Sequence, residues 1–271
     1  MAGLSISVVT YNNKDEIGRL LKSVLKYTKA VDYEITVVDN ASEDGTVEYI
    51  KNNFPTVKLI ETGENRGFGF GHNKMLGASS EFHAVLNPDI ELRSDVLSEL
   101  VNYLKANKDV ALVTPKILNP DGTQQYLPKR KPTFKYMLLG RLSRYVKALE
   151  PIRDEYTMKN TSMTEPTQIE FCTGCFMVMR TEYFRKAGGF DERFFMYLED
   201  VDLTERLSKY GKIMFYPRAS VVHNWEGGSS KNLRLMKIHI SSMFKYFKKQ
   251  RENKYCLLYT SPSPRDYAAS R

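Results

Sequence analysis

The sequence contains few cysteines and no long hydrophobic run, and each shortage excludes a class of protein. Three cysteines among 271 residues give no framework of disulfide bonds of the kind that small secreted domains require. No run approaches the roughly 18 consecutive apolar residues of a membrane-spanning helix. Residues 1–4 carry no signal-peptide pattern, so we expect a cytoplasmic protein.

Two common phosphate-binding motifs are missing as well. No Walker A sequence occurs, and Gly67, Gly69 and Gly71 do not fit the dinucleotide fingerprint because the third glycine comes too early. Glycines of this kind let the backbone approach a ligand closely, but they serve tight packing equally well. Both interpretations of this loop therefore stay open.

Positive charge is in excess, with a formal net charge of +8. Basic residues crowd positions 129–147 and 231–254, where apolar residues lie between them. Such stretches form solvated faces, or they bind an anionic membrane surface or nucleic acid. Because no recognisable nucleic-acid-binding motif occurs, we expect no nucleic-acid partner.

Strand-type and helix-type patterns alternate over residues 1–115. Strands that alternate with helices are typical of an α/β fold with a parallel sheet covered on both faces. Ser42 and Ser94 are the expected N-caps of the second and third helices. The patterns predict strands at 4–10, 33–38, 57–60, 84–86 and 110–114, and helices at 17–25, 42–53 and 94–104.

The rest of the chain divides by its composition. Residues 116–168 are rich in proline and basic residues, so we expect an insertion or lid with one short helix at 136–149. Residues 169–228 regain order, with strand-like runs at 169–180, 213–216 and 219–222 and a helix from Val201 onward. An amphipathic helix follows at 229–255. Residues 256–271 resemble a translated adapter sequence and are excluded from functional reasoning.

Polar residues follow two of the predicted strands where each one ends. Asn87-Pro88-Asp89 closes the fourth strand, because Pro88 cannot continue a strand ladder. Asp89 then lies at the carboxyl edge of the sheet, where open α/β sheets bind their ligands. Asp39-Asn40 ends another strand at this edge. Its carboxylate could accept the imide hydrogen of a uracil or thymine ring, or cap the following helix.

Two further groups of residues could take part in chemistry. Asp89 and His223 both end predicted strands, and a carboxylate with an imidazole suits manganese or magnesium, although a lone histidine is often structural. Glu199, Asp200 and Asp202 lie at the start of a predicted helix. Their charges would stabilise the helix terminus, or one of them would act as a general base.

The following motifs appear in order along the chain: Val8-Val9-Thr10-Tyr11-Asn12, Val38-Asp39-Asn40, Asn65-Arg66-Gly67 through Asn73, Asn87-Pro88-Asp89, Gly189-Phe190-Asp191, Glu199-Asp200-Val201-Asp202-Leu203 and His223. This series resembles that of the family-2 inverting glycosyltransferases of GT-A fold, and among them the rhamnosyltransferase-like branch. The resemblance covers about residues 4–249. It implies a Rossmann-like, mostly parallel central sheet flanked by helices.

The resemblance implies roles for individual residues. Residues 1–115 would bind the nucleotide sugar, and residues 169–228 would bind the acceptor and carry the catalytic residues. Asp89 and His223 would bind a divalent metal ion, Mn²⁺ or Mg²⁺. Asp200 would be the catalytic base, with Glu199 helping to place the acceptor. The nucleotide-sugar site would consist of Thr10, Tyr11, Asn12, Asp39, Asn40, Arg66, Gly67, Asn73, Asn87 and Asp89.

The implied reaction transfers one sugar with inversion. L-rhamnose from dTDP-rhamnose would pass to a glycan or polyprenyl-linked acceptor during synthesis of a cell-surface polysaccharide such as cell wall or O-antigen. The basic insertion and the last helix would face this acceptor or the anionic inner surface of the cytoplasmic membrane.

The sequence departs from the family pattern in two places. Asn87 replaces the first acid of the Asp-x-Asp motif and removes one negative charge from the metal site. The Gln-x-x-Arg-Trp element of processive relatives is absent, since the only tryptophan is Trp225, and this favours one transfer per encounter. An inactive nucleotide-sugar-binding or membrane-surface protein of the same fold is the alternative, against which the presence of Asp89, Asp200 and His223 argues.

Overall fold

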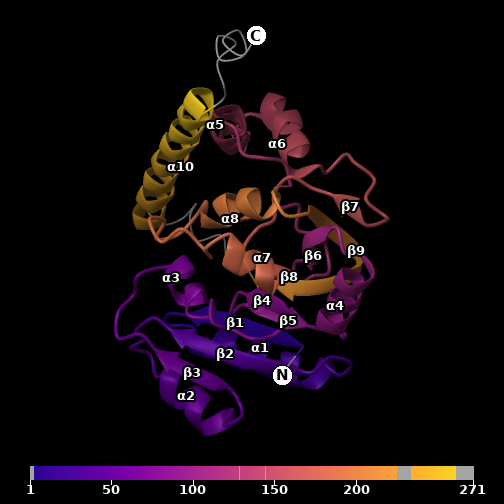
Figure 1. The fold of residues 1–271 in the computed structure, drawn as a ribbon, viewed down its shortest axis with the longest axis vertical. Coiled ribbons are helices and arrows are strands. Elements are labelled where there is room, and N and C mark those ends of the chain that lie inside the picture. The colour runs from indigo at the N-terminus through magenta and orange to yellow at the C-terminus, as the bar shows by residue number, and fades with distance from the viewer. Residues whose placement is uncertain (1–2, 128, 144, 225–232, 261–271) are drawn as a thin grey trace, which may run out of the picture.

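The computed structural model describes residues 3–127, 129–143, 145–224 and 233–260. Within these residues a nine-stranded sheet runs through the molecule (Figure 1). Its strands lie in the order β3-β2-β1-β4-β8-β6-β9-β5, and β7 pairs with β9 beside this path. The strands are β1 (Leu4–Thr10), β2 (Tyr33–Asp39), β3 (Lys58–Glu61), β4 (Phe82–Leu86), β5 (Ile90–Leu92), β6 (Val110–Leu118), β7 (Thr167–Gln168), β8 (Phe176–Arg180) and β9 (Lys212–His223).

Most of the long strands share one direction. β3, β2, β1 and β4 are parallel to one another, and β6 is parallel to β9. β8 lies between these two groups and is antiparallel to both β4 and β6, which therefore point the same way. The fold is α/β with a mostly parallel central sheet flanked by helices, as predicted.

Helices of very different length accompany this sheet. α5, α6 and α10 gather at the end of the molecule opposite α2 (Figure 1). None of the helices in the described ranges is long and apolar enough to cross a membrane. The helices are α1 (Lys14–Tyr27), α2 (Thr46–Asn53), α3 (Phe68–Asn73), α4 (Val96–Ala106), α5 (Phe134–Leu142), the 3₁₀ helix η1 (Lys147–Leu149), α6 (Glu150–Thr157), α7 (Thr181–Lys186), α8 (Glu199–Leu207) and α10 (Leu233–Thr260).

Apolar side chains fill both faces of the central strands. β1 and β4 are buried along their whole length, including the polar side chains of Ser5, Ser7 and His83, which lie among apolar neighbours. Successive residues of β4 belong to different core clusters, with Ala84 in one and Val85 in the other. A third cluster around Tyr246 joins α10 to the start of α8. A separate core cluster thus holds α10 against the start of α8.

Both predicted N-caps are wrong. α2 begins after Gly45, whereas the Ser42 hydroxyl donates to the Asp39 carboxylate at 2.5 Å. α4 is capped by Asp95, whose carboxylate accepts the Ser98 N–H at 3.3 Å. Serine and aspartate cap helices about equally well, so the local sequence pattern does not show whether Ser94 or Asp95 is the cap.

The second half of the chain differs more from the prediction. β6 continues to Leu118 because it pairs with β9, so the boundary expected after residue 115 falls inside a strand. The insertion holds α5, η1, α6 and β7 instead of one helix at 136–149. Only Phe176–Arg180 of the run at 169–180 is a strand, and residues 213–222 belong to one continuous strand, β9. α10 continues through Thr260, and residues 261–271 lie outside the described residues.

Candidate active site

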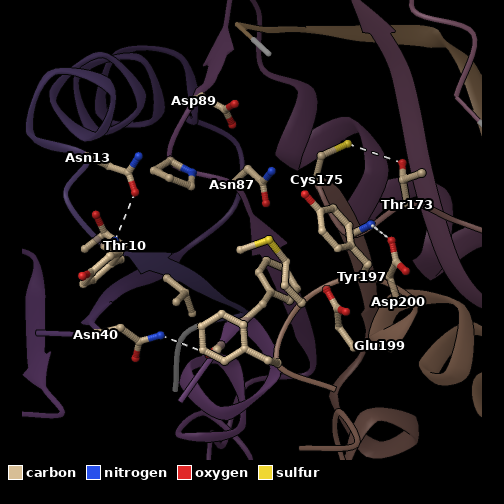
Figure 2. A pocket seen from close by; sticks show the side chains of 18 of the residues that line it. Thr10, Asn13, Asn40, Asn87, Asp89, Thr173, Cys175, Tyr197, Glu199 and Asp200 are labelled. Atoms are coloured by element: carbon tan, nitrogen blue, oxygen red, sulfur yellow. Dashed lines mark hydrogen bonds between the residues drawn. The ribbon is translucent and has the colours of Figure 1, made fainter. Parts of the chain in front are cut away.

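A cavity of about 520 Å³ opens beyond the carboxyl ends of β1, β2 and β4 and reaches the amino terminus of α8 (Figure 2). This is the edge where an open α/β sheet is expected to bind its ligand. The predicted residues Asn12, Asp39, Arg66 and Asn73 are not part of its lining. The predicted residues that do line it are Thr10, Tyr11, Asn40, Gly67, Asn87, Asp89, Glu199, Asp200 and His223.

The loops after β1 and β2 are tied together beside the cavity. The Asn12 N–H donates to the Ser42 hydroxyl at 2.9 Å, and the Glu43 N–H donates to Oδ1 of Asn12 at 2.8 Å. The Asp39 carboxylate is 2% exposed and accepts both the N–H and the hydroxyl of Ser42. Asn12 and Asp39 therefore support the cavity wall through these hydrogen bonds without lining the cavity. Oγ1 of Thr10 is buried with no hydrogen-bond partner in the described part of the chain.

The glycine-rich loop packs tightly. A Cβ placed on Gly67 would lie 2.1 Å from the Phe195 carbonyl oxygen, and one on Gly69 would lie 2.7 Å from Cβ of Phe190. The Phe68 N–H donates to that same Phe195 oxygen at 3.0 Å. Close packing accounts for the glycines, and it brings residues 195–197 to the cavity wall.

Two predicted donor-binding residues make other contacts. Arg66 forms exposed ion pairs with Glu64 at 3.7 Å and Glu192 at 3.6 Å. The Asn73 side chain donates to the Phe190 carbonyl at 2.9 Å and accepts the Phe190 N–H at 2.8 Å. Asn73 thus anchors the loop that leads to α8.

Asp89 and His223 meet at the end of the β5–β9 pair. Ile90 is paired with His223, and the Asn224 N–H donates to the Asp89 carbonyl at 3.0 Å. Nε2 of His223 lies 3.2 Å from Oδ2 of Asp89. Pairing of two strands far apart in the sequence thus brings these predicted metal ligands together.

The polar atoms of this pair fit a divalent cation. Oδ1 of Asp89 and Nε2 of His223 are buried, and neither has a hydrogen-bond partner among the described residues. A carboxylate and an imidazole are suitable ligands for Mn²⁺ or Mg²⁺. The described residues contain no group of three or more His, Cys, Asp or Glu that could hold a metal. Substrate oxygens and water would complete the coordination of an ion held by this pair.

The side of the cavity formed by the start of α8 is acidic. Glu199 is 6% exposed, and burial together with the Asp200 charge raises the pKa of Glu199 well above its ordinary value. Burial raises the pKa of Asp200 to about 6, although the N–H groups of Gly174 and Val201, which donate to its carboxylate at 2.9 and 2.8 Å, lower it. Asp200 is partly exposed and lines the cavity.

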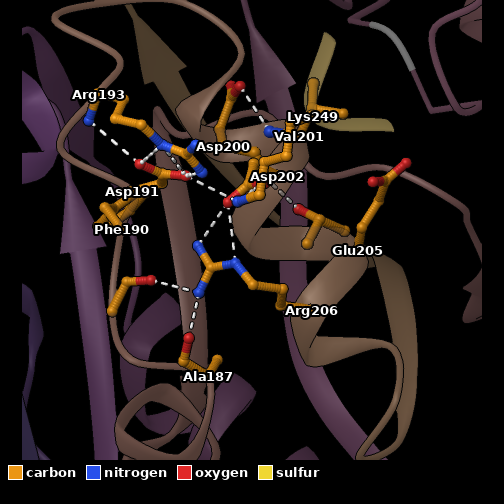
Figure 3. A network of polar contacts seen from close by, with 12 residues as sticks. Ala187, Phe190, Asp191, Arg193, Asp200, Val201, Asp202, Glu205, Arg206 and Lys249 are labelled. Carbon is orange, nitrogen blue, oxygen red and sulfur yellow. Dashed lines mark hydrogen bonds and ion pairs between the residues drawn. The ribbon is translucent and has the colours of Figure 1, made fainter. Parts of the chain in front are cut away.

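The third acid of this motif has a different role. Asp202 is 2% exposed and forms ion pairs with Arg206 at 2.7 Å and with Lys249 at 2.5 Å (Figure 3). Lys249 also binds Asp191 at 2.7 Å. The network joins α8, α10 and the loop before α8, so Asp202 is structural.

Several cavity residues gave no clear signal in the sequence. Phe195, Met196 and Tyr197 line the cavity, and the Gly174 N–H holds Asp200. Gly174, inside an otherwise strand-like run, is the one available hint, since such glycines mark close backbone approaches. Tyr197 has a φ of 70°, which a sequence pattern does not reveal.

The fold is shared with glycosyltransferases of solved structure. GalNAc-T7 with UDP, GalNAc and Mn²⁺ superposes with a TM-score of 0.61 at 18% identity, covering 83% of this chain and 43% of that one. The Pyrobaculum calidifontis mannosyltransferase PcManGT with GDP-Man and Mn²⁺ gives a TM-score of 0.58 at 17% identity, covering 84% and 58%. The chain therefore has the GT-A fold.

Comparison of the sequence with known families identifies its family. The sequence model of the family Glycosyl transferase family 2 matches residues 5–188, and the chain belongs to this family. It is 28% identical over 236 residues to the N-acetylglucosaminyl-diphospho-decaprenol L-rhamnosyltransferase of Mycobacterium tuberculosis, covering 82% of this chain and 76% of that protein. Rhamnosyltransferase WbbL of Escherichia coli K12 is 25% identical over 260 residues, covering 91% and 93%.

Proposed function

We propose that the enzyme transfers L-rhamnose from dTDP-rhamnose, with inversion, to a glycan or polyprenyl-linked acceptor in cell-surface polysaccharide synthesis. One observation carries the proposal: a single cavity contains the metal-type pair Asp89 and His223 and a carboxylate of raised pKa, Asp200. Both relatives are rhamnosyltransferases by name, which supports the sugar, and the name of the Mycobacterium tuberculosis protein includes a decaprenol-linked acceptor, which supports the lipid-linked acceptor.

The donor would lie along the carboxyl edge of β1, β2 and β4. Thr10, Tyr11 and Asn40 would line its nucleotide end. Asp39, which is 2% exposed and outside the lining, would support this end from behind through its hydrogen bonds to Ser42. In this proposal residues 1–115 serve the donor and residues 169–228 serve the acceptor and catalysis.

Asp89 and His223 would hold a divalent metal ion, which when bound would supply positive charge to stabilise the departing diphosphate. Asn87 lines the cavity beside them but is uncharged. The Asn87 N–H donates to the Cys175 carbonyl at 2.9 Å, so this turn is fixed against β8. Asp89 is thus the only carboxylate that the Asn87-Pro88-Asp89 turn offers to the metal.

Asp200 would act as the general base. Its carboxylate takes the proton of an acceptor hydroxyl while that oxygen forms a bond to the anomeric carbon. The bond from the anomeric carbon to the diphosphate oxygen breaks on the opposite face, so the configuration inverts. Glu199, whose pKa is raised by burial and by the Asp200 charge, would in its protonated form donate a hydrogen bond that orients the acceptor.

A donor screen with a transfer assay tests this function. Calorimetry in the presence of Mn²⁺ should show dTDP-rhamnose binding at least about 10-fold more tightly than UDP-glucose or GDP-mannose. Transfer to a polyprenyl-diphosphate saccharide should give a product of opposite anomeric configuration by NMR. Preference for a UDP-sugar would overturn the donor assignment. Tight donor binding without transfer to any acceptor would favour the inactive binding protein.

The enzyme would meet a lipid-linked acceptor at the anionic inner face of the cytoplasmic membrane. Lys237, Ile240, Phe244 and Lys248 follow one another along α10 at helical spacing, and Phe244 is 67% exposed. On α5, Phe134 is 59% exposed and its ring contacts Phe247 of α10 with 6.2 Å between ring centroids. These neighbouring helices present apolar and basic side chains together, the combination that binds anionic lipid.

Vesicle sedimentation at low salt examines this surface. The protein should sediment with phosphatidylglycerol vesicles and remain in solution with phosphatidylcholine. The double variant Phe134→Ser, Phe244→Ser should lower the bound fraction at least about 10-fold. Tyr126→Ser, which removes an exposed aromatic ring outside these helices, serves as the control. Failure of the unaltered protein to sediment would exclude a membrane-bound enzyme.

A further inference from the structure

Gln125 lies buried against His223 on the side away from Asp89. Its side-chain amide donates to the His223 carbonyl oxygen at 2.8 Å, and its Oε1 lies 3.1 Å from Nδ1 of His223. Gln125 is 9% exposed and His223 is 5% exposed. The Gln125 N–H in turn donates to the Ile117 carbonyl of β6 at 2.9 Å. One side chain thus contacts both the ring and the backbone of His223.

These two contacts determine which ring nitrogen carries the proton. The amide –NH₂ of Gln125 faces a carbonyl oxygen, so Oε1 must face the imidazole. An oxygen accepts but does not donate, and Nδ1 of His223 must therefore carry a hydrogen. In the neutral ring the lone pair then lies on Nε2, the atom that is 3.2 Å from Oδ2 of Asp89.

We propose that Gln125 is a positioning residue that fixes the tautomer and ring orientation of His223 for metal binding. The inference rests on the metal site of the proposed function. Partners of this kind on the second ring nitrogen orient ligating histidines and tune their affinity. The insertion at 116–168, predicted as a lid, would thus contribute a supporting residue to the metal site.

Metal affinity separates positioning from a purely structural role. Mn²⁺ binding is measured by electron paramagnetic resonance on the purified full chain with dTDP present, so that no transfer takes place. Gln125→Leu and Gln125→Met remove the acceptor and should weaken Mn²⁺ binding about 10–100-fold. Gln125→Glu keeps an acceptor for Nδ1–H but loses the donor to the His223 carbonyl, so it should weaken Mn²⁺ binding less than the leucine and methionine variants do. Gln124→Leu alters the neighbouring, partly exposed glutamine and is the matched control.

Nitrogen chemical shifts of His223 give a second readout that needs no metal. In the unaltered protein ¹⁵N NMR should show a hydrogen on Nδ1, and Gln125→Met should lower the fraction of rings that carry it. Unchanged Mn²⁺ affinity in a folded Gln125→Leu or Gln125→Met variant would overturn the inference while leaving the proposed function intact. If the unaltered protein itself binds no Mn²⁺, the metal site of the proposed function fails, and this inference fails with it.

Discussion

Glu199 and Asp200 are adjacent at the start of α8, yet their carboxyl groups have different surroundings. Oε2 of Glu199 is buried without a hydrogen-bond partner among the described residues, whereas the Asp200 carboxylate accepts two backbone N–H groups. Burial raises the pKa of Asp200 to about 6, and burial together with the Asp200 charge raises the pKa of Glu199 well above its ordinary value. Two acids whose pKa values are pushed apart in this way can act as base and hydrogen-bond donor at one site.

Asp200→Asn should abolish most transfer without affecting donor binding. An asparagine keeps the shape of the side chain but cannot accept the proton of the acceptor hydroxyl. We expect the transfer rate to fall about 10²–10⁴-fold while dTDP-rhamnose affinity by calorimetry stays unchanged. Asp202→Asn alters a nearby acid outside the cavity and shows what a structural change alone does. Turnover retained in Asp200→Asn would remove Asp200 from the role of base.

The rate of transfer should rise with pH and level off. The base acts only when ionised, and the pKa of Asp200 is raised to about 6 by burial. We expect log(kcat/KM) to increase with a slope near one below pH 6 and to be flat above about pH 7. Initial rates between pH 5 and 8 at saturating Mn²⁺ measure this. A flat profile over the whole range would contradict an ionisable base of this pKa.

Glu199→Gln should make stability less dependent on pH. A carboxyl group with a raised pKa holds its proton in the folded state after the unfolded chain has lost it near pH 4.3. Its contribution to stability is therefore complete at low pH and declines as the pH rises toward the folded-state pKa. Glutamine resembles the protonated acid and does not titrate. The free energy of unfolding of the variant, relative to that of the unaltered protein, should therefore rise by about 1.4 kcal/mol for each pH unit within that interval.

Urea unfolding of both proteins between pH 5 and 8 measures this gain. Two buried histidines act in the opposite direction, since burial lowers the pKa of His72 and of His83, the latter to about 4. Histidines of lowered pKa lose stability as the pH falls, so the total curve of either protein mixes both effects. The difference between the proteins cancels the histidines. A difference that does not change with pH would show that Glu199 is ionised when folded.

The sequence was informative about several strand ends. The strand at 4–10 was predicted with its observed bounds, because its apolar residues first alternate with serine and then become continuous. Asp89 and His223 each end a predicted strand, and they do lie together. The order of motifs along the chain was enough to recognise the family.

Loop residues that are placed only by tertiary contacts escaped prediction. Gln125 and Gly174 belong to no periodic pattern, and their partners His223 and Asp200 are distant in the sequence. Arg66 was assigned to the donor site on its motif alone, yet its described ion pairs are with exposed glutamates. Spacing along a chain tells which face of an element a residue occupies, but not which loop packs against it.

Gly67→Ala should destabilise the protein more than Gly63→Ala. Both glycines have positive φ, 99° and 72°, so each alanine incurs a backbone cost of about 1–2 kcal/mol. Gly67 also has a ψ of −179°, a region that only glycine populates, and its added Cβ would overlap the Phe195 carbonyl. Nothing lies within 4 Å of a Cβ at Gly63. Unfolding in urea should show a loss of about 3 kcal/mol or more for Gly67→Ala and about 1 kcal/mol for Gly63→Ala; equal losses would exclude the clash with Phe195.

Lys249→Met should loosen α10 from the active-site loop. The Lys249 ammonium is 16% exposed and lies between the Asp191 and Asp202 carboxylates, which belong to the loop before α8 and to α8 itself (Figure 3). Each carboxylate keeps one arginine partner after the substitution, so the cost should stay below the roughly 3–5 kcal/mol of an uncompensated buried charge. We expect a loss of about 1–3 kcal/mol in the free energy of unfolding.

Lys248→Met is the matched control, because Lys248 is the preceding residue of α10 and is exposed. It should change stability by less than about 0.5 kcal/mol.

The effect of Lys249→Met should also depend on pH. Burial raises the pKa of Asp191, but hydrogen bonds from Arg193 and Lys249 lower it further below its ordinary value. The ionised Asp191 carboxylate therefore stabilises the fold at neutral pH, and this stabilisation is lost on acidification below about pH 4. The cost of Lys249→Met should therefore be largest near pH 7 and shrink toward pH 3. Equal effects of the two lysine substitutions at pH 7 would show that this ion-pair network does not hold α10 in place.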